Sequence, residues 1–199
     1  MRILLILFIF LFSYTTYSQT AKEYFNNGLE KMKNEDFSSA IEDYTKAIEL
    51  DPNYADAYIN RGIAKNKLEN HSGAITDFTK AIELNPNYTY PYITRGWSKN
   101  NLMDYYGAIA DFNKAIELDP NDDDAYYNRG RSKHSLKDYS GAIADYTKAI
   151  ELNPSSHSYS NRGNAKEKLD DLLGACSDWR KAVNLGDTNA KKRIANKCN

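Results

Sequence analysis

Cysteine, histidine and long apolar runs are scarce in this sequence, and each scarcity excludes a class of protein. Only two cysteines, Cys176 and Cys198, occur among 199 residues, so the chain is not a disulfide-rich scaffold. The three histidines have no spacing typical of metal ligands. Lysine and arginine total 26 against 27 aspartates and glutamates, and no basic block stands out. This balance does not favour a nucleic-acid partner.

Recognisable catalytic motifs are missing as well. No serine or cysteine stands in a motif that would place a base beside it, and the glycines do not form a phosphate-binding loop. The acidic stretch at 121–124 is interpreted as a turn and helix start, where carboxylates favour the helix dipole, rather than as a calcium site. We therefore expect a chain that is not an enzyme and that binds no metal or cofactor.

The longest apolar run lies at the N-terminus. Arg2 precedes ten apolar residues (3–12), and small or polar residues fill 13–19. This order is typical of a secretory signal peptide, and the run is too short to span a bilayer, which needs about 20 residues. Thr16 and Ser18 suit cleavage after Ser18, so residues 1–18 are predicted to be a signal peptide and the mature chain to have no transmembrane segment. An uncleaved anchor and a first core helix are the alternatives.

The rest of the chain is dominated by an internal repeat. Gly62, Gly96 and Gly130 are 34 residues apart, and alanines and prolines recur with the same period. The stretch GAIADYTKAIELNP, which begins at Gly141, has three close copies and a looser fifth one, GACSDWRKAVNLGD. Apolar residues within it recur with helical spacing, Asp138 precedes it as a predicted N-cap, and Pro154 follows it. A period of 34 with fixed small residues predicts a helix–turn–helix solenoid.

These residues resemble the tetratricopeptide repeat. The unit 55–88 supplies the family pattern in register, and its members are Tyr58, Gly62, Ala74, Phe78, Ala81 and Pro86. The resemblance covers about 21–187 and implies an all-α fold, a right-handed α-solenoid of five helix–turn–helix repeats with a C-terminal capping helix. The predicted repeats are 21–54, 55–88, 89–122, 123–155 and 156–187, and the cap is 188–199. The capping helix is expected to close the end of the array and to carry three cations, Lys191, Lys192 and Arg193, on its outer face.

An arginine precedes each repeat glycine from the second unit onward, whereas the first unit has Asn27. Every second helix carries an aspartate, and the five are Asp43, Asp77, Asp111, Asp145 and Asp178. We expect each arginine to pair with the aspartate of the preceding unit, because the first unit has no predecessor. An anion-binding ladder is the alternative.

The two cysteines fall at the end of the array. Cys176 replaces a repeat isoleucine, and Cys198 ends the predicted cap. If the two helices run antiparallel about the turn at Gly186, the cysteines lie 10 residues before it and 12 after it, at nearly the same level. In an oxidising compartment they are predicted to form a disulfide that staples the cap.

The resemblance also implies that the first helix of each unit lines a concave groove. The predicted groove residues are Ile59, Ile63, Asn66, Tyr90, Ile93, Trp97, Asn100, Tyr127, Arg131 and His134, with Leu29, Met32 and Asn164 beside them. Aromatic and arginine side chains commonly anchor interfaces. Some family members clamp a chaperone carboxylate with lysine and asparagine, but Phe25, Leu29, Ile59 and Ile63 occupy the matching positions.

Together these features predict a non-catalytic scaffold for protein–protein interaction. The protein is predicted to be exported, with a periplasmic, outer-envelope or secreted location. It is expected to bind a peptide or protein partner in the groove. Two alternatives remain open: an architectural component of an envelope complex that self-assembles and has no groove ligand, or an accessory protein that binds glycan through its aromatics.

Overall fold

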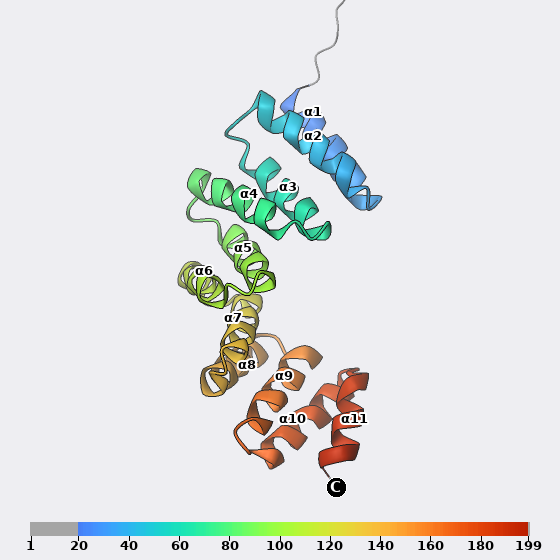
Figure 1. Cartoon of the computed structure of the whole chain (residues 1–199), viewed down its shortest axis with the longest axis vertical. Coiled ribbons are helices and arrows are strands. Elements are labelled where there is room, and N and C mark those ends of the chain that lie inside the picture. The colour runs from blue at the N-terminus through green and yellow to red at the C-terminus, as the bar shows by residue number, and fades with distance from the viewer. Residues whose placement is uncertain (1–19, 199) are drawn as a thin grey trace, which may run out of the picture.

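The computed structural model describes residues 20–198, and this part of the chain is an all-α solenoid. Eleven helices follow one another as antiparallel pairs, stacked into a curved array that opens to one side (Figure 1). The helices are α1 (Ala21–Lys33), α2 (Phe37–Leu50), α3 (Ala55–Lys67), α4 (His71–Leu84), α5 (Thr89–Asn101), α6 (Tyr105–Leu118), α7 (Asp123–Ser135), α8 (Tyr139–Leu152), α9 (Ser156–Glu167), α10 (Leu172–Asn184) and α11 (Thr188–Lys197). The predicted signal peptide lies outside the described residues.

One turn geometry joins the two helices of every repeat. Two or three residues after the first helix ends, one residue adopts the left-handed backbone conformation; the five are Glu35, Glu69, Met103, Lys137 and Asp170. The next residue is an aspartate or asparagine that caps the second helix, as when Asp104 accepts the Gly107 N–H at 2.9 Å. This cap satisfies a backbone donor that the helix leaves unpaired. The predicted cap Asp138 does the same for Gly141.

Small residues allow the paired helices to approach closely. A Cβ on Gly62 would lie 2.7 Å from Cε1 of Phe78, which is too close for any side chain. Ala74, Phe78 and Ala81 are almost fully buried beside that crossing. Because each unit also packs its second helix on the first helix of the next unit, the core is a series of neighbouring clusters rather than one centre.

The arginine–aspartate pairs differ from the prediction, because they form within a repeat. Arg61 contacts Asp77 of its own unit through Nε and Nη2, at 3.0 and 2.8 Å, and Nη1 donates to Thr45 of the preceding unit at 3.0 Å. The arginine therefore reaches both neighbours, but its carboxylate partner follows it by 16 residues. The geometry repeats at Arg95, Arg129 and Arg162. In the first unit, Lys31 pairs with Asp43 at 2.7 Å.

A second ladder connects consecutive first helices. Asn66 donates to Ser98 at 2.8 Å, and Ser132 donates to Asn100 at 2.8 Å, each pair spanning 32 residues. These pairs were not predicted, although the sequence contains a pattern that indicates them. Asparagine stands at this position only where the following unit supplies serine; Met32 and His134 stand there where the following unit supplies Ala64 and Ala165.

The last helix closes the array as predicted. Ala190 of α11 is fully buried against a cluster that includes Cys176, Trp179 and Ala182. Cys176 and Cys198 are joined by a disulfide with their Cα atoms 5.8 Å apart, which confirms the predicted staple. Of the three cations expected on the outer face, Arg193 instead turns inward and donates to Ser160 of α9 at 3.2 Å.

Candidate functional site

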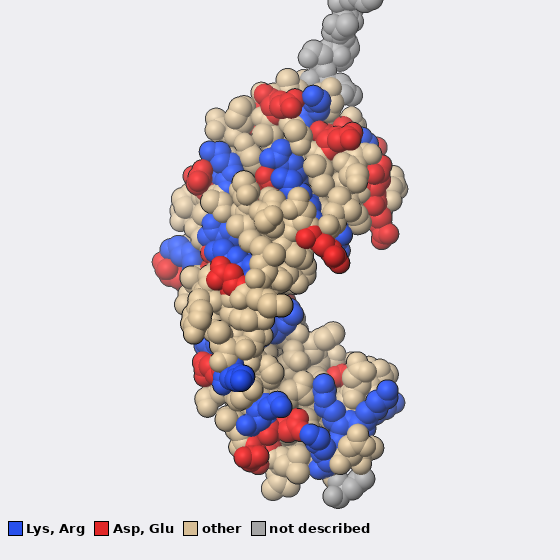
Figure 2. All heavy atoms as spheres, in the orientation of Figure 1, with Lys and Arg blue, Asp and Glu red and all other residues tan. Residues whose placement is uncertain are grey.

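The candidate site is the concave surface formed by the first helix of each repeat. These helices, α1, α3, α5, α7 and α9, lie on the inner side of the curve, and each touches the next one (Figure 1). The space-filling view shows the surface deeply hollowed between the two ends of the array (Figure 2). Three hollows follow one another along it from the second repeat to the cap.

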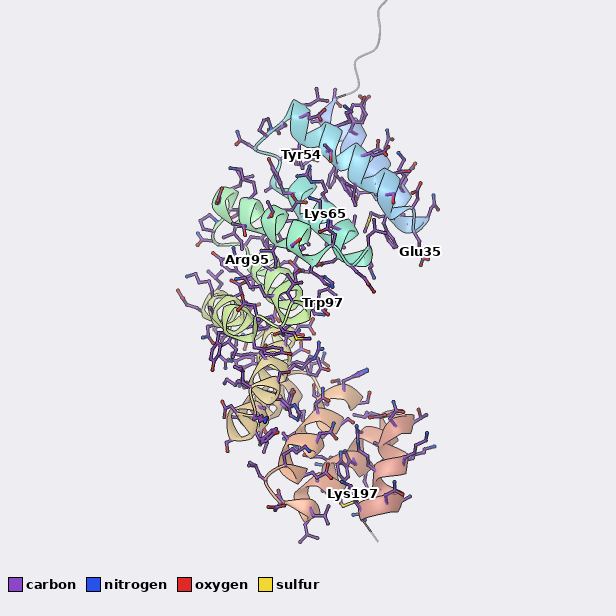
Figure 3. The ribbon with its side chains drawn as sticks, viewed as in Figure 1. Glu35, Tyr54, Lys65, Arg95, Trp97 and Lys197 are labelled. Carbon is purple, nitrogen blue, oxygen red and sulfur yellow. A yellow bond between two sulfur atoms is a disulfide. The ribbon has the colours of Figure 1, made fainter. Side chains whose placement is uncertain are left out.

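The first hollow is apolar and centres on Trp97. It measures about 220 Å³ and is lined by Ile63, Asn66, Lys67, Tyr90, Thr94 and Trp97 from α3 and α5. Trp97 is half-buried and projects from α5 toward the open side of the curve (Figure 3). Tyr90 is 43% exposed, and burial raises the pKa of its phenol, so it stays neutral at physiological pH. Both rings remain available to a ligand.

Neighbouring polar groups hold the Trp97 ring in place. His71 meets the ring edge-on, with the centroids 5.5 Å apart. The Nδ1 atom of His71 lies 3.0 Å from the side-chain oxygen of Asn66, and Asn66 in turn bonds to Ser98 beside Trp97. His71 is thus held beside one edge of the indole, and a side chain that is restricted in advance loses less entropy on binding.

The second hollow is polar and lies at the middle of the array. It measures about 230 Å³, and its lining includes Asn100, Arg131, His134 and Asn161. Arg131 is exposed and takes part in no ion pair among the described residues. Burial, with a smaller contribution from Lys168, lowers the pKa of His134, so its imidazole is neutral near pH 7. Amide groups beside a guanidinium that no carboxylate neutralises suit a polar or anionic ligand group.

The third hollow lies between α9 and the cap. It measures about 620 Å³ and is lined by hydroxyls and amides of α9 together with Lys192 and Arg193 of α11. One carboxylate, Asp187, also lines it, but this group already caps α11 by accepting the Asn189 and Ala190 N–H groups. Although burial opposes ionisation, these bonds, one with Ser160 and the charge of Arg193 lower the pKa of Asp187. The hollow therefore combines two cations with a carboxylate that is already bonded.

The structure separates the ten predicted groove residues into three groups. Ile63, Asn66, Tyr90 and Trp97 meet in the first hollow, and Asn100, Arg131 and His134 meet in the second. The remaining three, Ile59, Ile93 and Tyr127, line none of the three hollows. Ile59 is only 4% exposed, because it packs against the core beside Phe78.

Ile93 and Tyr127 point into the stack rather than into a hollow. Ile93 packs on a core cluster that includes Tyr92. The Tyr127 ring packs at a tilt against Tyr146, with the ring centroids 5.9 Å apart, and its hydroxyl accepts a hydrogen bond from Asn161 at 3.0 Å. The position three residues before the repeat glycine thus packs into the stack of helices, mainly against the second helix of its own unit. The residue after the glycine, as at Trp97, faces the groove.

Several lining residues were missed by the sequence reasoning. Thr94 and Asn161 each stand directly before a repeat arginine, and only the arginines were predicted to have a role. The third hollow as a whole was missed, because the cap was interpreted only as a lid with an outward basic face. Nothing in the sequence indicates that α11 also closes one end of the groove, since that depends on the angle between α10 and α11.

Two family models match the chain, and both describe the same repeat. One, described as "Tetratricopeptide repeat", matches residues 55–88 and 123–156, and the other, described as "TPR repeat", matches 28–68 and 104–136. Together the matched ranges cover more than half of the sequence. The ranges of the first model correspond to the helix pairs α3–α4 and α7–α8, whereas those of the second include α2–α3 and α6–α7, each of which spans two repeats. The chain belongs to the tetratricopeptide-repeat family. No curated protein matches it significantly.

Solved structures of tetratricopeptide-repeat proteins have the same fold. A structure described as MamA protein is 26% identical with a TM-score of 0.77, covering 86% of this chain and 94% of its own. YrrB, described as a TPR protein with an unusual peptide-binding site, is 21% identical with a TM-score of 0.74 and coverages of 88% and 92%. TTC0263, a thermophilic TPR protein from Thermus thermophilus, is 16% identical, with a TM-score of 0.70 and coverages of 90% and 99%.

Neither a membrane span nor a metal-ligand cluster occurs in the described part of this tetratricopeptide-repeat chain. Across residues 20–198, no helix is long and apolar enough to cross a membrane. Over the same range, no three histidine, cysteine, aspartate or glutamate side chains gather as metal ligands would.

Proposed function

We propose that this tetratricopeptide-repeat protein is an exported, non-catalytic scaffold that binds an extended segment of a partner protein along its concave groove. The role as a scaffold for protein–protein interaction follows from the family, whose members mediate interactions between proteins. The groove ligand and the location are our proposals. YrrB, a chain of the same fold, is described as having a peptide-binding site, so the fold accommodates such a ligand.

The Trp97 hollow is the observation that carries the proposal. At about 220 Å³ it is smaller than the roughly 300–1,000 Å³ typical of small-molecule sites. Its size suits one apolar side chain rather than a whole ligand. Its aromatic and aliphatic walls supply apolar contact. Asn66 uses one side-chain N–H for Ser98 and keeps the second for a peptide carbonyl, and the Thr94 hydroxyl, which donates to the Tyr90 carbonyl, can still accept.

The experiment compares two aromatic truncations. Partners are captured from an envelope fraction by crosslinking and mass spectrometry, and overlapping peptides of the captured protein are then titrated. Trp97→Ala is expected to weaken peptide binding by roughly 2 kcal/mol or more while the helical signal is unchanged. Tyr106→Ala is the matched control, because Tyr106 is 76% exposed and lies outside the three hollows. Equal binding by both variants would favour the architectural alternative.

Export is tested separately. The order of Arg2, the apolar run 3–12 and the small residues before Gln19 supports cleavage after Ser18. N-terminal sequencing of the protein purified from its native envelope fraction is expected to begin at Gln19. A full-length product in the cytosol would contradict export but would leave the groove proposal unaffected.

A further inference from the structure

We propose that the C-terminal half of the groove recognises carboxylates, so that the preferred partner segment carries an apolar anchor and acidic residues. This inference rests on the proposed function, because it names the chemistry of the segment that the groove binds. It places the apolar anchor in the Trp97 hollow and the acidic residues between α7 and α11.

Two cations of this half of the groove, Arg131 and Lys192, have no carboxylate partner among the described residues. Arg131 lines the second hollow and Lys192 the third, and neither takes part in an ion pair among residues 20–198. Arg193 donates to the Ser160 hydroxyl, and its charge also acts on Asp187, whose pKa it lowers. By contrast, the four arginines of the repeat motif, represented by Arg61, are all bound to aspartates.

Carboxylates are nearly absent from the same surface. Asp187 is the acidic residue in the linings of the second and third hollows, and its oxygen already serves as the α11 cap. The capping segment 188–199 contains four lysines and arginines and no acidic residue. The field in this half of the groove is therefore positive, which attracts acidic segments and repels basic ones.

The opposite end of the array has the reverse charge. Residues 21–54 contain four lysines against eight aspartates and glutamates. Figure 2 shows acidic side chains gathered over α1 and α2, and basic side chains gathered over α11. This asymmetry confines the attraction for carboxylates to the C-terminal half. Hydroxyls and amides of Ser156, Asn161 and Asn164 add hydrogen-bond donors to the same wall.

The test uses two synthetic peptides and the full mature chain. Each fluorescein-labelled probe has a central Phe-Leu pair, flanked on both sides by glutamates in one probe and by lysines in the other. Flanking both sides makes the test independent of the direction in which the peptide binds. At about 0.15 M salt, fluorescence anisotropy is expected to show at least about fivefold tighter binding of the glutamate probe, because each exposed charge contact contributes modestly.

Three charge reversals then locate the contact. Arg131→Glu and Lys192→Glu are each expected to weaken the glutamate probe by about fivefold or more, since attraction becomes repulsion. Lys191→Glu is the matched control: Lys191 is exposed on the same helix but does not line the hollow. It changes the net charge equally and is expected to leave the affinity within about twofold.

The outcomes separate this inference from the proposed function. If both probes bind equally and Trp97→Ala abolishes both, the groove binds peptides but carboxylate recognition is overturned. If the glutamate probe does not bind at all, carboxylate recognition is likewise overturned.

Sedimentation of the chain alone provides a further check. Concentration-dependent association that Lys192→Glu abolishes, without probe binding, would assign the basic hollow to the acidic first repeat of a second copy.

Discussion

Arg95 binds Asp111 of its own repeat and at the same time reaches Thr79 of the preceding one. Its Nε and Nη2 atoms donate to the two carboxylate oxygens at 3.0 and 2.7 Å, and Nη1 donates to the threonine hydroxyl at 3.0 Å. The guanidinium also lies 5.7 Å from the Tyr92 ring centroid. One side chain thus fixes both the packing within a unit and the angle between two units.

Arg95→Ala is expected to destabilise the array by about 2 kcal/mol without affecting the groove ligand. Removing the arginine leaves a buried carboxylate with fewer donors, although Lys99 still contacts Asp111 at 2.8 Å. Urea unfolding followed by circular dichroism measures the change. Lys114→Ala, which removes an exposed pair with Glu117, is the control and should cost less than about 0.5 kcal/mol. Loss of peptide binding with unchanged stability would contradict the structural role.

Met103→Gly is expected to stabilise the third repeat by about 0.5–1 kcal/mol. Met103 adopts φ of 62° in the turn between α5 and α6, where a Cβ costs about 1 kcal/mol or more. Its side chain is 75% exposed, so little packing is lost. Part of the gain is offset because glycine loses more backbone entropy on folding. Met103→Ala retains the Cβ and should show no comparable gain in thermal unfolding; a similar gain would refute strain relief.

Cys198→Ser is expected to release the cap. The disulfide closes a loop of 22 residues, for which the chain-entropy model gives about 3 kcal/mol. The amide hydrogen-exchange rate in a peptide covering 188–198 should therefore rise by about a hundredfold. Adding a reductant to the unmutated protein should raise the exchange rate in the same peptide to the same extent. A peptide covering 55–67 is the internal control, because repeats are stabilised mainly by their neighbours. Unchanged exchange in the cap would show that packing of Ala190 alone holds it.

Acidification is expected to weaken the fourth repeat through His134. Burial lowers the pKa of His134 below its usual 6.5, so the unfolded chain takes up the proton more readily than the folded one. The free energy of unfolding therefore falls as the pH drops below about 6.5, and the loss stops below the folded pKa. Urea unfolding at pH 7.5 and 5.5 measures this loss.

A matched pair of variants assigns the effect to His134. His134→Asn should reduce the dependence on pH, since it removes the titrating group, whereas His157→Asn replaces a histidine outside the second hollow. If the two variants respond to pH identically, His134 is not the group responsible.

Much of the architecture follows from the sequence because the repeat is so regular. The spacing of glycine, alanine and proline determines ten helices and their pairing, and the predicted unit starts at 21, 55, 89, 123 and 156 coincide with the starts of α1, α3, α5, α7 and α9. The sequence also predicted local hydrogen bonding, because Asp138 caps the N-terminus of α8 as expected. The disulfide was predictable because helix rise brings Cys176 and Cys198 to one level once the two helices run antiparallel about the turn at Gly186.

The sequence by itself determined which residues are small, which cap helices and which cysteines meet, since these depend on spacing along one helix or across one turn. The tertiary structure alone decided which carboxylate each arginine binds and which side of a first helix faces the groove. Both depend on the angle at which one unit packs on the next. That angle buries Ile59, leaves Trp97 accessible, and turns Arg193 of the cap toward the groove. A different packing angle exchanges these roles without changing any spacing in the sequence, so only the packed array fixes them.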